Sequence, residues 1–202
     1  MSETKYPCLI LCGGASQRFE HGHKAMAKLG DKSVLQHVID RISPQVSQIA
    51  INAAHNVGFE RFNLPLRPDG PGESKGPLAG VVAAMEWAEH SGYQRVLTCS
   101  NDTPFVPTDL VSALEVSAAD MISVPVHNGQ RHFVCALWPT ALRESLRDYL
   151  KNGGRAVQGF IQSQPVEYIE LNDKSGVDLF FNVNRSDDLR TAERMLQELT
   201  RL

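Results

Sequence analysis

The feature that most constrains this chain is an apolar run near its N-terminus that ends in a pair of glycines. Residues 6–12 read YPCLILC, and Gly13-Gly14 follow directly. A strand that is apolar on both faces is typical of a parallel sheet covered by helices on both sides. Glycines that leave such a strand permit a tight turn and a close approach of the backbone to a ligand. The run therefore predicts an α/β fold with a binding loop after its first strand.

The rest of the chain continues an alternation of strands and helices. The further predicted strands are residues 48–52, 64–68 (the weakest), 95–99, 121–126, 131–138 and 165–171. The predicted helices are residues 34–42, a helix that starts at Pro77, residues 107–114 and 140–150, and a last helix from about Ser186. This order favours a single-domain α/β fold with a doubly wound, mostly parallel (Rossmann-like) sheet flanked by helices. Trp87 and Trp138 lie in apolar runs, so we expect both in the core.

Composition narrows the class of protein. The 202 residues suit one domain, and 42% apolar and 21% charged residues are ordinary for a globular chain. A net charge of -3 does not favour nucleic acid, and no apolar stretch reaches the roughly 18 residues of a membrane helix. The N-terminus does not resemble a secretory signal, and the four cysteines form no C-x-x-C pair. We therefore expect a cytoplasmic protein with buried, free thiols and no nucleic-acid or membrane partner.

The loop after the first strand combines glycine amides with cations. Arg18 and Lys24 lie within or just after it, and Lys28 follows. Backbone N–H groups beside guanidinium and ammonium groups suit a triphosphate. The loop matches neither the P-loop pattern nor G-x-G-x-x-G. From spacing alone, a phosphate cradle and a glycine turn with incidental surface cations both remain open.

Asp102 stands just beyond the predicted strand 95–99. In open α/β sheets, ligands bind at the carboxyl ends of the strands, and Mg²⁺ is typically held by one or two carboxylates plus substrate phosphates. The following Thr103-Pro104 also suits a simple turn, in which the aspartate has a structural role. The residues alone leave a metal ligand and a turn aspartate equally open.

Six segments, taken together and in order, resemble the signature of the MobA-like nucleotidyltransferases, and in particular their molybdenum cofactor branch. They are L-x-G-G-x-S-x-R (residues 11–18), Lys24-Ala25, Leu29-Gly30-x-Lys32-x-x-Leu35, Gly76-Pro77-Leu78-Ala79-Gly80, Asn101-Asp102-Thr103-Pro104 and Phe181-Asn182-Val183-Asn184. The resemblance spans nearly the whole chain. The first segment and D-T-P are shared with many sugar-phosphate nucleotidyltransferases, whereas G-P-L-A-G with a late N-V-N is more specific.

The resemblance implies an enzyme that transfers GMP from GTP to the terminal phosphate of molybdenum-molybdopterin and releases pyrophosphate, with Mg²⁺ as cofactor. The implied partners are GTP, molybdopterin and possible insertion chaperones of molybdoenzymes. Two alternatives stay open: a cytidylyltransferase that acts on the same pterin, and a non-catalytic nucleotide-binding relative. The implied division is a nucleotide-binding portion over about residues 1–126 and an acceptor-binding portion over about 127–202.

The resemblance also assigns roles by position. Leu11, Cys12 and Gly13 contact the nucleotide through backbone, Lys24 neutralises the β- and γ-phosphates, Asn52 and Asp69 contact the nucleoside, and Asp102 binds Mg²⁺. Arg18, Arg155, Asn182 and Asn184 face the pterin phosphate side. Asp102, Lys24 and Arg18 form the implied catalytic group.

Four departures from the family pattern lie in or near these motifs: Cys12, the pair Phe19-Glu20, His23 and Asn101. Glu20 and His23 are the support for the non-catalytic alternative, since a carboxylate near a triphosphate repels it. His21 and His23 do not by themselves favour a metal site, because no third ligand is placed. Residues 128–131 (NGQR) predict a hairpin turn, which family position also makes a candidate pterin-facing loop.

Overall fold

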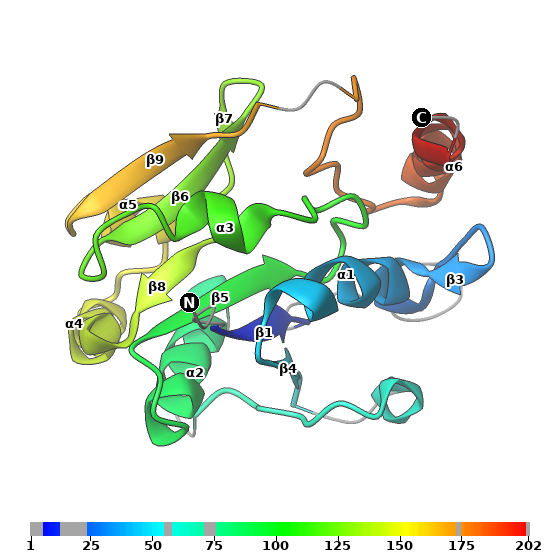
Figure 1. The fold of residues 1–202 in the computed structure, drawn as a ribbon. Helices are drawn as coiled ribbons and strands as arrows, with labels where there is room; N and C mark the ends of the chain where they lie inside the picture. Colours follow the sequence, from blue (N-terminus) through cyan, green and yellow to red (C-terminus); the bar gives the residue numbers. More distant parts are fainter. Residues whose placement is uncertain (1–5, 13–23, 55–57, 71–75, 173–174, 201–202) are drawn as a thin grey trace.

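The computed structural model describes residues 6–12, 24–54, 58–70, 76–172 and 175–200. In these residues seven strands form one sheet in the order β4-β1-β5-β8-β6, with β7 and β9 both paired to β6 (Figure 1). The strands are β1 (Pro7–Leu11), β4 (Gln48–Asn52), β5 (Arg95–Ser100), β6 (Ile122–His127), β7 (Gln130–Arg131), β8 (Leu137–Pro139) and β9 (Val166–Glu170). β4, β1, β5, β6 and β9 run in one direction, while β7 and β8 are antiparallel to their neighbours. The predicted α/β fold with a mostly parallel sheet is confirmed.

Helices cover both faces of this sheet. They are α1 (Val34–Ile42), α2 (Pro77–His90), α3 (Leu110–Leu114), α4 (Arg143–Lys151), α5 (Val157–Ile161) and α6 (Ser186–Thr200). Four 3₁₀ turns join them in the described residues, η1 (Lys24–Met26), η2 (Ser43–Gln45), η3 (Phe59–Phe62) and η4 (Thr140–Leu142), with a small hairpin of β2 (Lys28–Leu29) and β3 (Lys32–Ser33). No described helix is both long and apolar enough to cross a membrane.

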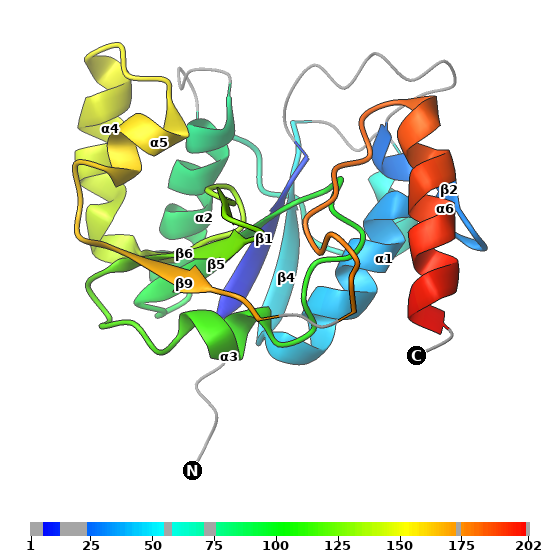
Figure 2. The ribbon, with the colours of Figure 1, turned by 90° about the horizontal axis from the view of Figure 1, so that it is seen from above.

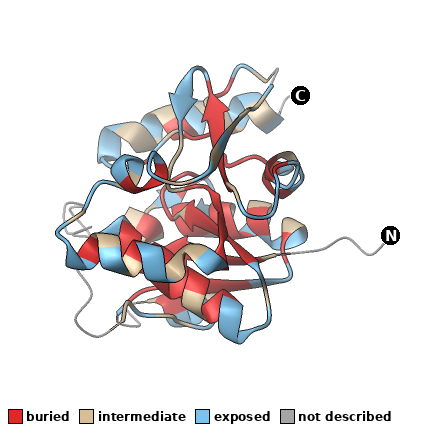
Figure 3. Ribbon diagram, turned by 90° about the vertical axis from the view of Figure 1, so that its left-hand side faces the viewer, coloured by how far each residue is buried: buried red, intermediate tan, exposed pale blue. Residues whose placement is uncertain are grey.

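Two apolar cores follow from the alternation of side chains along β1. Leu9 and Leu11 point to one face and pack with α2, α4 and α5. Cys8 and Ile10 point to the other face and pack with α1 and α3. Figure 2 shows the two helical layers on either side of the strands, and Figure 3 shows the buried strands between them. A strand buried on both faces explains the continuous apolar run that opens the chain.

Other core predictions are also confirmed. Trp87 and Trp138 are buried, and so are Cys8, Cys12, Cys99 and Cys135, all of which are free thiols. The residues 128–131 form the predicted hairpin turn between β6 and β7. Asn128 and Gly129 both adopt positive φ, 50° and 72°, as a type I′ turn requires.

Three predicted elements differ from the structure. The predicted strand 131–138 is interrupted: Arg131 belongs to β7, and the last two residues belong to β8. Between them, residues 132–135 make a turn in which the Cys135 N–H donates to the His132 carbonyl (3.0 Å). Residues 64–68 contribute one isolated bridge, Ile51 to Leu66, since neighbouring prolines cannot donate to a ladder. The helix predicted at 107–114 begins only at Leu110. α5 was not predicted, because its five residues are too few to show a period.

The connections create a switch point beside β1. The chain leaves β1 through α1 to reach β4, and then returns through α2 to β5 on the other side of β1. Adjacent strands whose connections depart in opposite directions leave a crevice at their carboxyl ends, which is where ligands bind in such sheets. Leu11 and Ser100 are paired at this edge. The ends of β1 and β5 therefore define the candidate site.

Candidate functional site

Asp102 lies at the switch point, two residues beyond the end of β5. It is only 5% exposed, so its charge needs partners. Its Oδ2 forms an ion pair with the Lys24 ammonium group, and its Oδ1 accepts a hydrogen bond from the Ser100 hydroxyl. Lys24 begins η1, which follows the predicted phosphate loop. The fold thus joins two residues that are 78 positions apart in the chain.

The segment that precedes α6 completes this cluster. Lys24 Nζ donates a hydrogen bond to Asn184 Oδ1 (3.0 Å), and the Val183 N–H donates to the Asp102 carbonyl (2.9 Å). Asp188, in the first turn of α6, accepts from the N–H groups of Asn184 and Arg185 (2.8 Å each) and fixes the local turn. A cation, a carboxylate and an amide from three distant segments therefore meet at one edge of the sheet.

On the other side of β1, Asn52 and Asp69 contact each other. Asn52 Nδ2 donates to Asp69 Oδ1 (2.9 Å) and to the Arg67 carbonyl (2.8 Å). Asn52 is buried at the end of β4, whereas Asp69 remains partly accessible. Because Asn52 uses both of its amide hydrogens on protein groups, it holds the 67–69 segment beside the strand ends.

Gly80 explains the small residue at the end of the G-P-L-A-G segment. A Cβ atom at this position in α2 would lie 2.7 Å from Asn52 Oδ1 and 2.9 Å from Leu11 Cδ2. Both distances are shorter than real Cβ contacts, so a larger residue would displace the helix or the asparagine. The glycine therefore lets α2 approach the ends of β1 and β4 closely.

The backbone of Cys12 is tied to the end of β4. Its N–H donates to the Asn52 carbonyl (3.1 Å), and its side chain is buried. Burial raises the pKa of the thiol to about 12, with the Asn101 side chain acting in the opposite direction. The thiol is therefore neutral at physiological pH and adds no charge next to a phosphate.

The remaining predicted site residues are less closely tied. Asn182 is exposed and lies next to Val183 in the segment before α6. Arg155 follows α4, and its Nη1 donates to the carbonyls of Leu150 and Gly154 (2.7 and 2.6 Å). In the described residues no hydrogen bond or ion pair joins Arg155 to Lys24 or Asp102, and Figure 2 shows α4 and α6 on opposite sides of β1. Gly13 and Arg18, as well as Gly14, Glu20, His21 and His23, lie outside the described residues.

Sequence reasoning missed Ser100 and two histidines, His127 and His132. Ser100 stands two positions before Asp102 at the end of β5, and the segment Ser100-Asn101-Asp102 offered the signal, since polar residues at a strand end face the ligand edge. The two histidines carry no signal in the local sequence, because only the fold brings them to the segment before α6.

The donor set at Asp102 suits a hard divalent cation. Carboxylate, hydroxyl and amide oxygens come from Asp102, Ser100 and Asn184. No group of three or more His, Cys, Asp or Glu side chains that could hold a metal is present in the described part of the chain. One carboxylate is compatible with Mg²⁺, which usually keeps waters and substrate phosphates as its other ligands. The Lys24 ammonium pairs with Asp102 Oδ2, so a cation bound to that oxygen would replace this ion pair.

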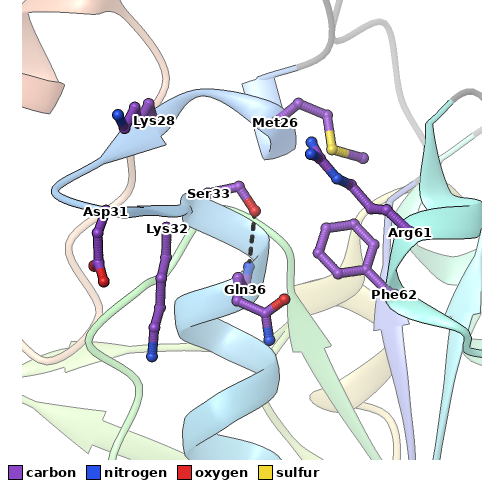
Figure 4. A pocket seen from close by; sticks show the side chains of 8 residues that line it. All are labelled: Met26, Lys28, Asp31, Lys32, Ser33, Gln36, Arg61 and Phe62. Carbon is purple, nitrogen blue, oxygen red and sulfur yellow. Dashed lines mark hydrogen bonds between the residues drawn. The ribbon is translucent and has the colours of Figure 1, made fainter.

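A separate hollow of about 420 Å³ lies between the β2–β3 hairpin, the start of α1 and η3 (Figure 4). Arg61 and Phe62 face Met26 across it, and Ser33 caps α1 by accepting a hydrogen bond from the Gln36 N–H (3.2 Å). Lys32, at its rim, forms an ion pair with Asp40 (2.7 Å) outside the hollow. Lys28, Asp31 and Arg61 also line the hollow.

Comparisons with known proteins show the family to which the chain belongs. The sequence model of the "MobA-like NTP transferase domain" matches residues 8–167. A relative from Mesorhizobium japonicum named "Molybdenum cofactor guanylyltransferase" is 38% identical over 200 residues, covering 95% of this chain and 96% of the relative. A second protein of that name, from Acidiphilium cryptum, is 37% identical over 92% of both chains.

Solved structures show the same fold. Molybdopterin-guanine dinucleotide biosynthesis protein A from Archaeoglobus fulgidus aligns with a TM-score of 0.74 at 20% identity, over 95% of this chain and 99% of that one. The 2-C-methyl-D-erythritol 4-phosphate cytidylyltransferase from Thermus thermophilus aligns with a TM-score of 0.66 at 18% identity, over 96% and 99%. From its sequence and its fold, the chain belongs to the MobA-like NTP transferase family.

Proposed function

We propose that this protein transfers GMP from GTP to the terminal phosphate of molybdenum-bound molybdopterin and releases pyrophosphate. The observation that carries the proposal is the cluster of Lys24, Asp102 and Asn184 at the switch point of the sheet. Relatives with 35–38% identity over most of the chain bear the name of this activity. The same cluster joins a residue after the proposed phosphate loop to one in the proposed acceptor segment.

The proposal assigns different roles to the two portions of the chain that the family resemblance implies. About residues 1–126 bind the nucleotide and about residues 127–202 bind the acceptor. Leu11, Cys12 and Gly13 present backbone groups to the nucleotide, and Asn52 with Asp69 contacts the nucleoside. Asn182 and Asn184, together with Arg18 and Arg155, face the pterin phosphate. Arg155 reaches this role only if it leaves its two backbone carbonyls.

The chemistry needs no protein nucleophile. An ionised oxygen of the acceptor phosphate attacks the α-phosphorus of GTP and forms the new P–O bond. The bond from that phosphorus to the bridging oxygen breaks, and pyrophosphate leaves with the electron pair. The ammonium of Lys24 offsets the charge of the β- and γ-phosphates, and the family's glycine loop positions them. Positioning and neutralisation of charge dominate catalysis in reactions of this kind.

We propose Mg²⁺ as the cofactor, held by Asp102. When bound, a divalent cation supplies positive charge that neutralises the phosphate oxygens. Asp102 is buried and fixed by Ser100, so its carboxylate is already oriented. Release of Lys24 from Asp102 to the phosphates would leave Oδ2 for the cation. A cytoplasmic location and delivery of the product to a molybdoenzyme or its insertion chaperone belong to the same proposal.

The decisive experiment uses the purified full chain with Mg²⁺, molybdenum-loaded molybdopterin and either GTP or CTP. We expect the guanine dinucleotide and one pyrophosphate per turnover with GTP. Formation of the cytosine dinucleotide instead would replace the proposal with the cytidylyltransferase alternative. Nucleotide binding with neither product, while a known guanylyltransferase works under the same conditions, would favour a non-catalytic relative.

A further inference from the structure

Two histidines outside the proposed catalytic cluster hold the segment that reaches it. This segment, Val177–Asn184, has no regular secondary structure between β9 and α6. In the described residues one backbone–backbone hydrogen bond joins it to the end of the sheet, from the Val183 N–H to the Asp102 carbonyl. Val177, Phe180 and Val183 are nevertheless buried. Contacts between side chains and this segment must therefore fix its path.

His127 provides the first of these contacts. It is the last residue of β6 and is 5% exposed. Its Nε2 faces the Leu179 N–H (3.4 Å) and the Asn128 side-chain amide (3.1 Å). A backbone N–H can only donate, so Nε2 must accept, and a neutral ring then carries its proton on Nδ1. Nδ1 is buried and has no partner in the described residues.

His132 provides the second contact. Its ring stacks on Phe180, with 3.9 Å between ring centroids and 13° between the planes. Burial lowers the pKa of His132, and Asp178 in the same segment partly opposes this effect. The ring of Phe180 also lies 6.1 Å from that of His127. The two histidines thus contact consecutive residues of the segment, Leu179 and Phe180, which lie five and four positions before Asn184.

We propose that His127 and His132 position the Asn182-Val183-Asn184 segment for the acceptor and so set the affinity for the phosphorylated pterin. They act through Leu179 and Phe180 and are positioning residues, because neither touches the catalytic cluster. When Nε2 of His127 accepts from the Leu179 N–H, its Nδ1 is left buried without a partner among the described residues. In the opposite tautomer the proton on Nε2 would face the Leu179 N–H, so this contact would be lost unless Leu179 moved. This inference rests on the proposed function for the identity of the acceptor.

The tautomer of His127 gives a test that needs no activity. Long-range ¹H–¹⁵N spectra of the ¹⁵N-labelled full chain should show the proton on Nδ1 of His127 at pH 8. In His127→Leu, amide exchange at Leu179 and Val183 should become about tenfold faster, in line with the loss of one hydrogen bond. A proton on Nε2 of His127, or unchanged exchange in the variant, would overturn the proposal.

Kinetics separate positioning from general destabilisation. We expect His127→Leu and His132→Leu to raise the KM for the pterin about tenfold, with the KM for GTP within about twofold. His127→Gln keeps an acceptor for Leu179, and His132→Phe keeps the stacked ring, so both should restore most of the affinity. His90→Leu, on the outer end of α2, is the matched control and should change neither KM.

The two ways of failing can be told apart. Equal rises in both KM values, or no rescue by His127→Gln and His132→Phe, would show a structural role and overturn the inference while the enzyme remains active. If the wild-type chain forms no guanine dinucleotide, the proposed function fails. The tautomer and the amide exchange then still decide whether the histidines hold this segment.

Discussion

At the scale of single residues, the site is arranged around one buried carboxylate that is satisfied in two ways. Asp102 pairs with Lys24 and accepts a hydrogen bond from Ser100. The side chain of Lys24 is 20% exposed and that of Asp102 7%, so the ammonium is the more accessible partner. A triphosphate offers Lys24 more negative charge than one carboxylate does. Substrate binding can therefore replace the ion pair. In the proposed function Asp102 pairs with Lys24 before the substrate binds and holds the cation afterwards.

Asp102→Asn is the sharpest change at this scale. The amide keeps the shape of the side chain but loses the charge that holds a cation, so kcat should fall by about 100-fold or more, as for loss of a key electrostatic group. Steady-state turnover over a Mg²⁺ titration measures it. Asp109→Asn, at an exposed position before α3, is the control and should retain activity. Turnover by Asp102→Asn with the Mg²⁺ dependence of the wild type would remove Asp102 from the metal site.

His132 gives the chain a predictable pH dependence. Burial lowers its pKa below the ordinary value of 6.5, so between the two pKa values the unfolded chain binds more protons. Stability should therefore fall as pH drops through about 6.5 toward the folded-state pKa. His132→Phe should lose less free energy of unfolding than the wild type between pH 7.5 and 5.5, as measured by urea denaturation. Equal losses in the two proteins would contradict this assignment.

At the scale of elements, α2 packs closely against the ends of β1 and β4, where we propose that the nucleoside binds. Pro77 starts this helix, and ten of its residues are buried between the sheet and α4. Gly80 is the point of closest approach to β1 and β4. Arg143 and Arg147 of α4 form ion pairs with Glu89 and Glu86 of α2 on the outer side. α2 is thus held by the sheet on one side and by α4 on the other. We therefore expect that it cannot shift easily to accommodate a larger side chain at position 80.

Gly80→Ala tests this close approach. Alanine favours a helix by about 1 kcal/mol over glycine, but overpacking costs about 1–3 kcal/mol. We expect a net loss in the free energy of unfolding and a higher Kd for GTP. The loss should shrink when Asn52→Ser removes the atom that the new Cβ would strike, and a double-mutant cycle measures this coupling. Additive effects of the two changes would contradict the proposed clash.

At the scale of the whole molecule, the last fifth of the chain returns to segments that lie much earlier in the sequence. The Val183 N–H donates a hydrogen bond to the Asp102 carbonyl, and Asn184 Oδ1 accepts one from Lys24 Nζ. Ala192 of α6 packs in one apolar cluster with Leu29 and Val34. The two proposed portions therefore share one site and are not independent units. A ligand that engages either portion should stabilise the entire fold.

Thermal unfolding checks this linkage. GTP with Mg²⁺ at 100 times its Kd should stabilise the chain by about 2.7 kcal/mol. For a domain of this size that corresponds to a rise in Tm of about 5–10 °C. CTP at the same concentration should give a smaller shift. A larger shift with CTP than with GTP would support the cytidylyltransferase alternative.

The layers of the fold and the family follow from the sequence alone, and the sequence also predicts the residues of the candidate site. Strands buried on both faces carry continuous apolar runs, and helices carry a period, so β1, α1, β4, α2 and β5 could be predicted from local pattern. Lys24 and Asp102 could be predicted as well, because the order of the motifs matches a known family. The predicted strand at 131–138 was wrong, since a buried apolar run has no period that separates a strand from a turn.

The contacts between residues that are distant in the sequence become visible only in the folded chain. No local pattern shows that Asn184 reaches Lys24, or that Gly80 must be small because Asn52 lies 2.7 Å from its missing Cβ. The tautomer of His127 is likewise set by the Leu179 N–H, 52 residues later in the chain. These contacts depend on the packing of whole layers, because the orientation of one element against another is fixed by shape and burial and not by its own sequence.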